Sequence, residues 1–287
     1  MNNKHFIYIL IFAMLLWGAG WSALKILTAE LSMEIIIFWR FFIMSLAFLP
    51  ILYFLDKPLS LNIASIKYIV GSAILNIFFM VFAFIGVKNG LAGGGGVIIT
   101  TLSPVMTFIL VALLFKKRLQ NIQYFGLLLG IIGGAIMLQI NNLELFLNSS
   151  NIYFLLCAIT WAGVTVLAQY SHKHIHPIHY SFIISVIATI VTFIYGINFE
   201  LLSVFEQDKR FWVSLLYLAI LGQTVATTIF FIASGKLGSE TTSSFMFLVP
   251  LFALFIAWLI LDEVMQIHII IGGMFSIIAV WFVNYKK

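Results

Sequence analysis

Two groups of aromatic and polar residues recur at helical spacing in distant parts of the chain. The first group is Trp17, Trp21 and Lys25, and the second is Trp161, Thr165 and Gln169. Residues four apart lie on one face of a helix, so each group predicts a helix that presents aromatic and polar side chains together. Two such faces could line a binding cavity. The alternative is that the tryptophans are packing residues and that Lys25 and Gln169 mark helix ends.

Arg40 stands within the next apolar run, where a charged side chain is costly if it faces lipid. A guanidinium binds a carboxylate well through two parallel hydrogen bonds, which makes Arg40 a candidate for holding a substrate carboxylate. The alternative, equally open, is a structural anchor in which Arg40 pairs with Glu30 or Glu34.

Two prolines predict interruptions in the later apolar runs. Pro104 and Pro250 lack a backbone N–H, which frees the carbonyl groups of Thr100 and Met246. The freed carbonyls and the hydroxyls beside them could meet a polar substrate, or the hydroxyls could satisfy the backbone at a kink. Further candidates for the lining of the cavity are Asn76, Phe79, Thr100, Ser103, Gln223 and Thr227.

The sequence suggests neither a metal site nor a cofactor. Four histidines, His172, His174, His176 and His179, cluster in one short segment, but no cysteine or carboxylate accompanies them. A solvated loop is therefore expected there. The lone Cys157 lies within an apolar run and is expected to pack.

The composition identifies the elements that must position these residues. The chain has 287 residues, of which 63% are hydrophobic and only 9% are charged. A soluble protein needs more polar surface, whereas about 180 apolar residues suffice for nine or ten membrane spans of ~20 residues each. The net charge of +5 is scattered rather than gathered in a stripe, which argues against a nucleic-acid partner. We therefore expect a polytopic membrane protein in a lipid bilayer.

Ten apolar stretches predict an all-α protein with ten transmembrane helices, because they are too long for barrel strands and do not alternate. They cover residues 5–27, 33–55, 66–87, 92–115, 121–140, 151–170, 178–197, 211–233, 240–261 and 267–285. With the N-terminus in the cytoplasm, ten of the 15 Lys and Arg residues lie on the cytoplasmic side and four outside. This bias predicts that both termini are cytoplasmic, which agrees with an even number of spans.

The first half of the chain reappears in the second half. The corresponding pairs are Trp17 and Trp161, Lys88 and Lys236, and Pro104 and Pro250, at shifts of 144, 148 and 146 residues. We expect repeats of five helices over residues 1–143 and 151–287. Because five is odd, the second repeat must be inverted. Inverted repeats with a binding site near the membrane midplane are typical of secondary transporters.

The order and spacing of several motifs resemble the EamA transporters of the drug/metabolite transporter superfamily over the whole chain. The motifs are Leu16-Trp17-Gly18, Lys25, Arg40, Pro250, Asp262-Glu263 and Gly272-Gly273. The resemblance implies two EamA domains in tandem and an inner-membrane permease, often an exporter of amino acids or other small metabolites. Lys117 departs from the family pattern, which usually has an acidic residue in that turn, and this argues against an ion-binding or catalytic role there.

The leading functional hypothesis is a permease for small organic molecules that works by alternating access and is not an enzyme. Two alternatives are a membrane-embedded enzyme and a channel or scaffold. The chain has no nucleotide-binding motif, so it should not hydrolyse ATP itself. The sequence does not decide the substrate, the direction of transport, proton coupling, or whether the protein is a monomer or a homodimer.

Overall fold

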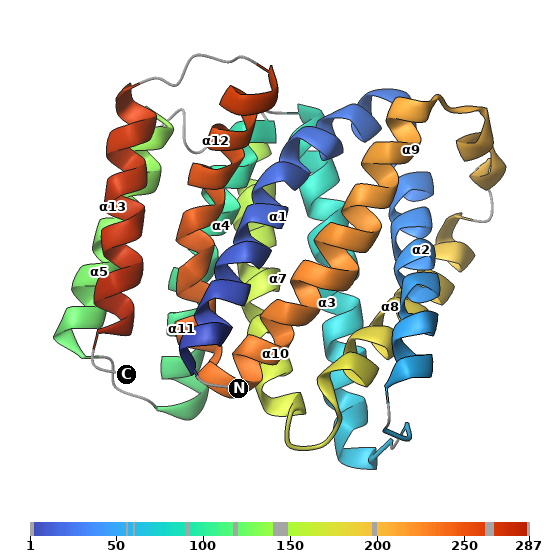
Figure 1. The fold of residues 1–287 in the computed structure, drawn as a ribbon, viewed down its shortest axis with the longest axis horizontal. Helices are drawn as coiled ribbons and strands as arrows, with labels where there is room; N and C mark the ends of the chain where they lie inside the picture. The colour runs from blue at the N-terminus through green and yellow to red at the C-terminus, as the bar shows by residue number, and fades with distance from the viewer. Residues whose placement is uncertain are drawn as a thin grey trace.

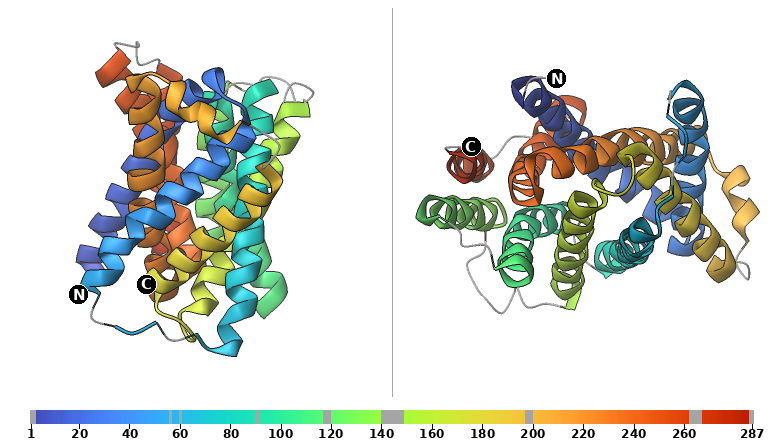
Figure 2. Two further views of the ribbon diagram at one scale, coloured as in Figure 1. Left: turned by 90° about the vertical axis from the view of Figure 1, so that its right-hand side faces the viewer. Right: turned by 90° about the horizontal axis from the view of Figure 1, so that it is seen from below.

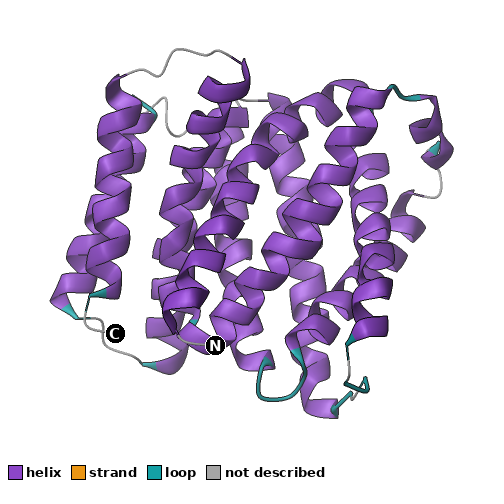
Figure 3. Ribbon diagram, in the orientation of Figure 1, coloured by secondary structure: helices purple, strands orange, loops and turns teal. Residues whose placement is uncertain are grey.

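The computed structural model describes residues 3–55, 57–59, 61–89, 92–116, 120–139, 149–196, 200–261 and 267–285. In these ranges all regular secondary structure is helical, which confirms the predicted class (Figure 3). A helix satisfies its own backbone polar groups, as hydrocarbon surroundings require. The predicted turns at Lys117-Arg118 and Asp262-Glu263 lie outside the described residues.

Seven helices of the described chain are long and apolar enough to cross a membrane. Six of them are α1 (Asn3–Glu30), α2 (Met33–Phe54), α3 (Ile63–Asn89), α4 (Ala92–Phe115), α7 (Ser149–Ser171) and α8 (Pro177–Gly196). The seventh is continuous over Lys209–Leu237 and consists of α9 (Lys209–Leu216), the π-helix η2 (Tyr217–Thr227) and α10 (Thr228–Leu237).

The remaining elements are shorter. They are α5 (Asn121–Met137), the 3₁₀-helix η1 (Leu201–Glu206), α11 (Ser239–Ser244), the 3₁₀-helix η3 (Phe245–Leu248), α12 (Val249–Leu261) and α13 (Ile267–Asn284). The ninth predicted span is thus interrupted just before Pro250, as the proline suggests. By contrast, α4 runs unbroken through Pro104. The π-helix in the eighth span was not predicted.

The helices form an elongated bundle with distinct edges (Figures 1 and 2). Helices α5 and α13 pair at one edge, and α2 packs on α8 at the other. Helices α1, α3, α4, α7, α10 and α12 lie between the two pairs. Both termini lie at one end of the bundle, which we call the terminal end, and the other is the opposite end (Figure 1).

The outer surface suits a lipid solvent. Large apolar side chains are strongly exposed, among them Tyr53 at 84% and Ile63 at 85%. Hydroxyl side chains such as Ser72 and Ser234 are instead fully buried. Within a membrane, polar groups are expected to face the bundle interior. This arrangement allows polar side chains to gather around an internal site.

Candidate functional site

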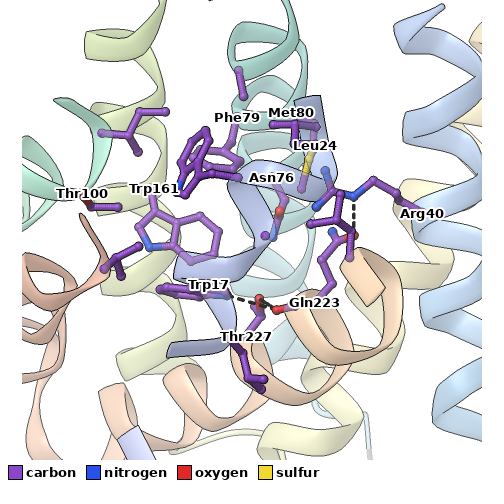
Figure 4. A pocket seen from close by; sticks show the side chains of 18 of the residues that line it. Trp17, Leu24, Arg40, Asn76, Phe79, Met80, Thr100, Trp161, Gln223 and Thr227 are labelled. Atoms are coloured by element: carbon purple, nitrogen blue, oxygen red, sulfur yellow. Dashed lines mark hydrogen bonds between the residues drawn. The ribbon is translucent and has the colours of Figure 1, made fainter. Parts of the chain in front are cut away.

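A cavity lies inside the bundle, between helices that come from both halves of the chain (Figure 4). The cavity volume is about 110 Å³. The lining residues are Leu16, Trp17, Gly20, Trp21, Leu24, Arg40, Asn76, Phe79, Met80, Ala83, Ile99, Thr100, Trp161, Leu218, Gly222, Gln223, Thr227, Met246 and Val249.

The cavity extends from the middle of the bundle toward the opposite end. Helices α1 and α3 both start at the terminal end, and their lining residues, 16–24 and 76–83, lie in their later parts. On the terminal side, the aromatic residues Tyr180, Phe230 and Phe231 are almost completely buried. The rings of Tyr180 and Phe231 lie 5.6 Å apart. Aromatic side chains therefore pack between the cavity and the terminal end of the bundle.

The aromatic floor of the cavity consists of Trp17, Trp161 and Phe79. The rings of Trp17 and Trp161 meet edge to face at 5.2 Å, and Phe79 lies 5.0 Å from Trp161. The two tryptophans that correspond in the sequence repeat, one on α1 and one on α7, are thus in direct ring contact. The indole Nε1 of Trp17 donates to the Gly222 carbonyl at 3.0 Å, whereas that of Trp161 is buried without a partner among the described residues.

Arg40 forms the polar side of the cavity. Its side chain is only 7% exposed, and its Nε donates to the Gln223 side-chain oxygen at 3.1 Å. Figure 4 shows this pair on the side of the cavity away from Trp161. Within the described ranges Arg40 forms no ion pair, so the suggested pairing with Glu30 or Glu34 does not occur. The guanidinium is therefore a buried cation held by a neutral amide.

The π-helix η2 determines where Gln223 and its neighbours lie. Widened turns leave side chains and carbonyls in positions that a regular helix would not give them. The carbonyl of Gly222 accepts hydrogen bonds from Trp17 and from the Thr227 hydroxyl, the latter at 3.2 Å. The Tyr217 hydroxyl donates back to the Leu16 carbonyl of α1 at 2.9 Å. These contacts tie η2 to α1 across the two halves.

Nine of the thirteen residues suggested by the sequence line the cavity. They are Trp17, Trp21, Arg40, Asn76, Phe79, Thr100, Trp161, Gln223 and Thr227. Sequence reasoning missed the apolar lining, for example Leu24, Met80 and Val249. An apolar residue in an apolar helix carries no signal that distinguishes cavity from lipid or core.

The other four suggested residues lie elsewhere. Lys25 is exposed on α1, one turn beyond Trp21. Ser103 and Thr165 are fully buried, and each hydroxyl donates to the carbonyl four residues earlier in its own helix. Gln169 accepts from the backbone N–H of Ser239 at 2.9 Å and so satisfies a free donor where α11 begins.

The hydroxyls near Pro104 mainly serve the backbone. Those of Thr100 and Thr107 donate to the carbonyls of Gly96 and Ser103, at 2.7 and 2.8 Å. These are bonds to carbonyls four residues earlier in the same helix, and none of them goes to the Thr100 carbonyl that Pro104 frees. Thr100 still contributes its remaining surface to the cavity.

The histidine segment is more buried than expected for a solvated loop. His179 is 3% exposed, and a side-chain atom added at Gly235 would overlap the ring of His172. Burial lowers the pKa of His172 below its ordinary value, which favours the neutral ring. No group of three or more potential metal ligands occurs among the described residues.

Comparison with known proteins agrees with this architecture. The sequence pattern of the EamA-like transporter family matches residues 5–139 and 148–285. The uncharacterized transporter YoaV of Bacillus subtilis is 24% identical and covers 91% of this chain over 90% of its own length. An uncharacterized transporter of Synechocystis is 27% identical, over 95% of this chain and 87% of its own. One solved crystal structure shares the fold, with a TM-score of 0.74 over 98% of this chain and 96% of the other, at 15% identity.

A helical membrane bundle with two matching repeats and an internal cavity defines a multi-pass membrane transport protein. The chain belongs to the EamA-like transporter family, because the two matches together cover nearly its whole length. The resemblance seen in the sequence motifs is therefore confirmed.

Proposed function

We propose that the protein is a secondary transporter that exports small organic metabolites, such as amino acids, by alternating access. The observation that carries this proposal is the cavity of Figure 4, which combines a buried cation with an aromatic floor between the two family repeats. Substrate sites near the midplane at the repeat interface are typical of secondary transporters.

In the proposed topology, ten helical segments cross the inner (plasma) membrane and both termini are cytoplasmic. Residues 1–143 and 151–287 form two inverted repeats of five helices. The positions of both termini at one end of the bundle support an even number of crossings (Figure 1). The shorter apolar helices α5 and α13 lie side by side as the last helices of the two repeats. Together with the segment formed by α11, η3 and α12, they bring the seven long helices to ten crossings.

With this orientation, the present conformation has its cavity directed toward the outer face. Aromatic packing around Tyr180 and Phe231 then closes the cytoplasmic side. Transport requires a second conformation in which the two repeats have rocked and opened that side. The nine lining residues named above are the proposed substrate contacts. Ser103, Thr165 and Gln169 are assigned to helix structure, and Lys25 to the exposed surface of α1.

Two linked experiments test this function. Metabolite profiles of spent medium from deletion and overexpressing strains should differ in one or a few small organic compounds. The purified protein in liposomes should then carry the identified compound with saturable flux that rises when unlabelled compound is present on the other side. Linear flux without this stimulation would favour a channel, and unchanged profiles together with no flux would contradict a transporter.

A further inference from the structure

The two sides of the cavity differ sharply in chemistry. One side holds Arg40 and the amides of Gln223 and Asn76, whereas the floor is formed by the rings of Trp17 and Trp161 (Figure 4). Among the described residues, the lining contains no aspartate or glutamate. A ligand that fits both sides must therefore carry complementary groups at its two ends.

We propose that the cavity selects amphipathic organic anions, with a carboxylate bound to Arg40 and an apolar or aromatic body on the tryptophan floor. This inference rests on the proposed transport function and adds the substrate class to it. The contacts of the described side chains support each half of the assignment.

The proposed negative charge of the ligand follows from the surroundings of Arg40. Arginine stays protonated in proteins, so the buried side chain brings a full positive charge to the cavity wall. A buried charge is costly unless it is paired, and Gln223 supplies only a neutral acceptor. An anionic ligand would provide the missing countercharge.

The geometry of the hydrogen bond favours a carboxylate. Gln223 accepts from Nε, and no other described residue takes a hydrogen bond from the guanidinium. The two terminal amino groups remain, and they form the fork that holds both oxygens of a carboxylate. Gln223 thus acts as a positioning residue, because it fixes the orientation of the guanidinium without neutralising it.

The proposed apolar body of the ligand follows from how the indole N–H groups of the tryptophan floor are placed. Trp17 Nε1 is already engaged by the Gly222 carbonyl, and Trp161 Nε1 is covered by neighbouring atoms in this conformation. Neither tryptophan exposes its indole donor to the cavity in this conformation, so both present mainly ring surface. An apolar chain or ring placed against this ring surface would bury its own apolar area.

Three probes of one shape separate charge from hydrophobicity: phenylacetate, phenylacetamide and phenethylamine. Ligand-induced thermal stabilisation of the purified protein in detergent gives an affinity for each, and it avoids passive leakage across a bilayer. We expect phenylacetate to bind at least tenfold more tightly than the amide, and the amine to bind most weakly. Equal binding of acid and amide, or no stabilisation by phenylacetate, would overturn the proposal.

Variants at Arg40 connect the preference to this side chain. Arg40→Gln should reduce the ratio of acid to amide affinity to about one, whereas Arg40→Lys should weaken acid binding but keep a preference for the acid. Arg210→Gln is the matched control, because Arg210 is exposed and lies outside the cavity. An acid preference that survives in Arg40→Gln would overturn the assignment. If Arg40→Gln does not fold, the Arg40→Lys protein provides the test. Binding of phenylacetate by Arg40→Lys as tightly as by the wild type would also overturn the assignment.

Failure of this inference differs from failure of the proposed function. A protein that binds the three probes with equal affinity but still exchanges its identified metabolite in liposomes is a transporter with another substrate class. Absence of exchange for every compound identified in spent medium would instead contradict transport itself.

Discussion

At the scale of the residue, Trp17 and Trp161 show how equivalent positions can differ. Both rings belong to the cavity floor, but only Trp17 has a partner for its indole N–H, because η2 brings the Gly222 carbonyl to it. The repeat in the sequence indicated that the two positions correspond and that both helix faces could line a cavity. It could not predict which donor is used, since that depends on the π-helix in the second half.

Replacing each tryptophan by phenylalanine tests this difference. Trp17→Phe removes a partly buried hydrogen bond and should lower the free energy of unfolding by about 1 kcal/mol beyond the effect of the smaller ring. Trp161→Phe removes a buried donor without a partner and should be the milder change. Melting temperatures of both variants in detergent measure this, and equal losses would contradict the assigned hydrogen bonding.

The polar site residues were predictable to the extent that a polar group in an apolar helix must face protein or water. Arg40, Asn76 and Gln223 stood out for this reason, and all three line the cavity. Ser103 and Thr165 stood out equally but bond to their own helices. Short hydroxyl side chains can satisfy themselves locally, so their presence alone does not indicate a site.

At the scale of the element, the membrane spans were predictable from the length of the apolar stretches. Of the irregular helical segments, the one just before Pro250 was predictable from the proline, whereas the π-helix η2 was not. The prediction of 211–233 for the eighth span lies within the observed helix Lys209–Leu237. The π-helix inside it is hydrogen-bonded to α1, for example from the Tyr217 hydroxyl to the Leu16 carbonyl. A pattern of apolar residues carries no information about such a local change of winding.

The pairing of α5 and α13 depends on glycines at their contact. A side-chain carbon added at Gly272 would lie 2.6 Å from the Gly133 carbonyl oxygen and 2.5 Å from Met137 Cγ. Gly272→Ala should therefore push the helices apart and cost roughly 1–3 kcal/mol of stability. Gly222→Ala is the control, since the nearest atom there is 3.8 Å away. Thermal unfolding in detergent should show a clear loss for the first variant only; similar melting temperatures would contradict this close packing.

At the scale of the whole molecule, the orientation of the bundle is the main prediction. Reporter fusions at Lys287 and within the turn at residues 116–118 should read as cytoplasmic, and a fusion near Gln207 should read as periplasmic. The distribution of Lys and Arg gives the physical reason, because positively charged loops are retained inside. A cytoplasmic reading at Gln207 would contradict the orientation and the inversion of the second repeat.

The central claim is that one cavity between the repeats is reached from both faces of the membrane in turn. The chain suits a test by thiol labelling, because its single cysteine, Cys157, is buried and can be replaced by alanine. In that background, Thr227→Cys places a thiol in the cavity, and Lys25→Cys places one on the exposed part of α1.

The decisive measurement is the reaction of these two thiols with a membrane-impermeant maleimide in vesicles of each orientation. Alternating access predicts that the thiol at position 227 reacts from either face, whereas the thiol at position 25 reacts only from the outer face. Labelling at position 227 from a single face under all conditions would contradict alternating access through this cavity.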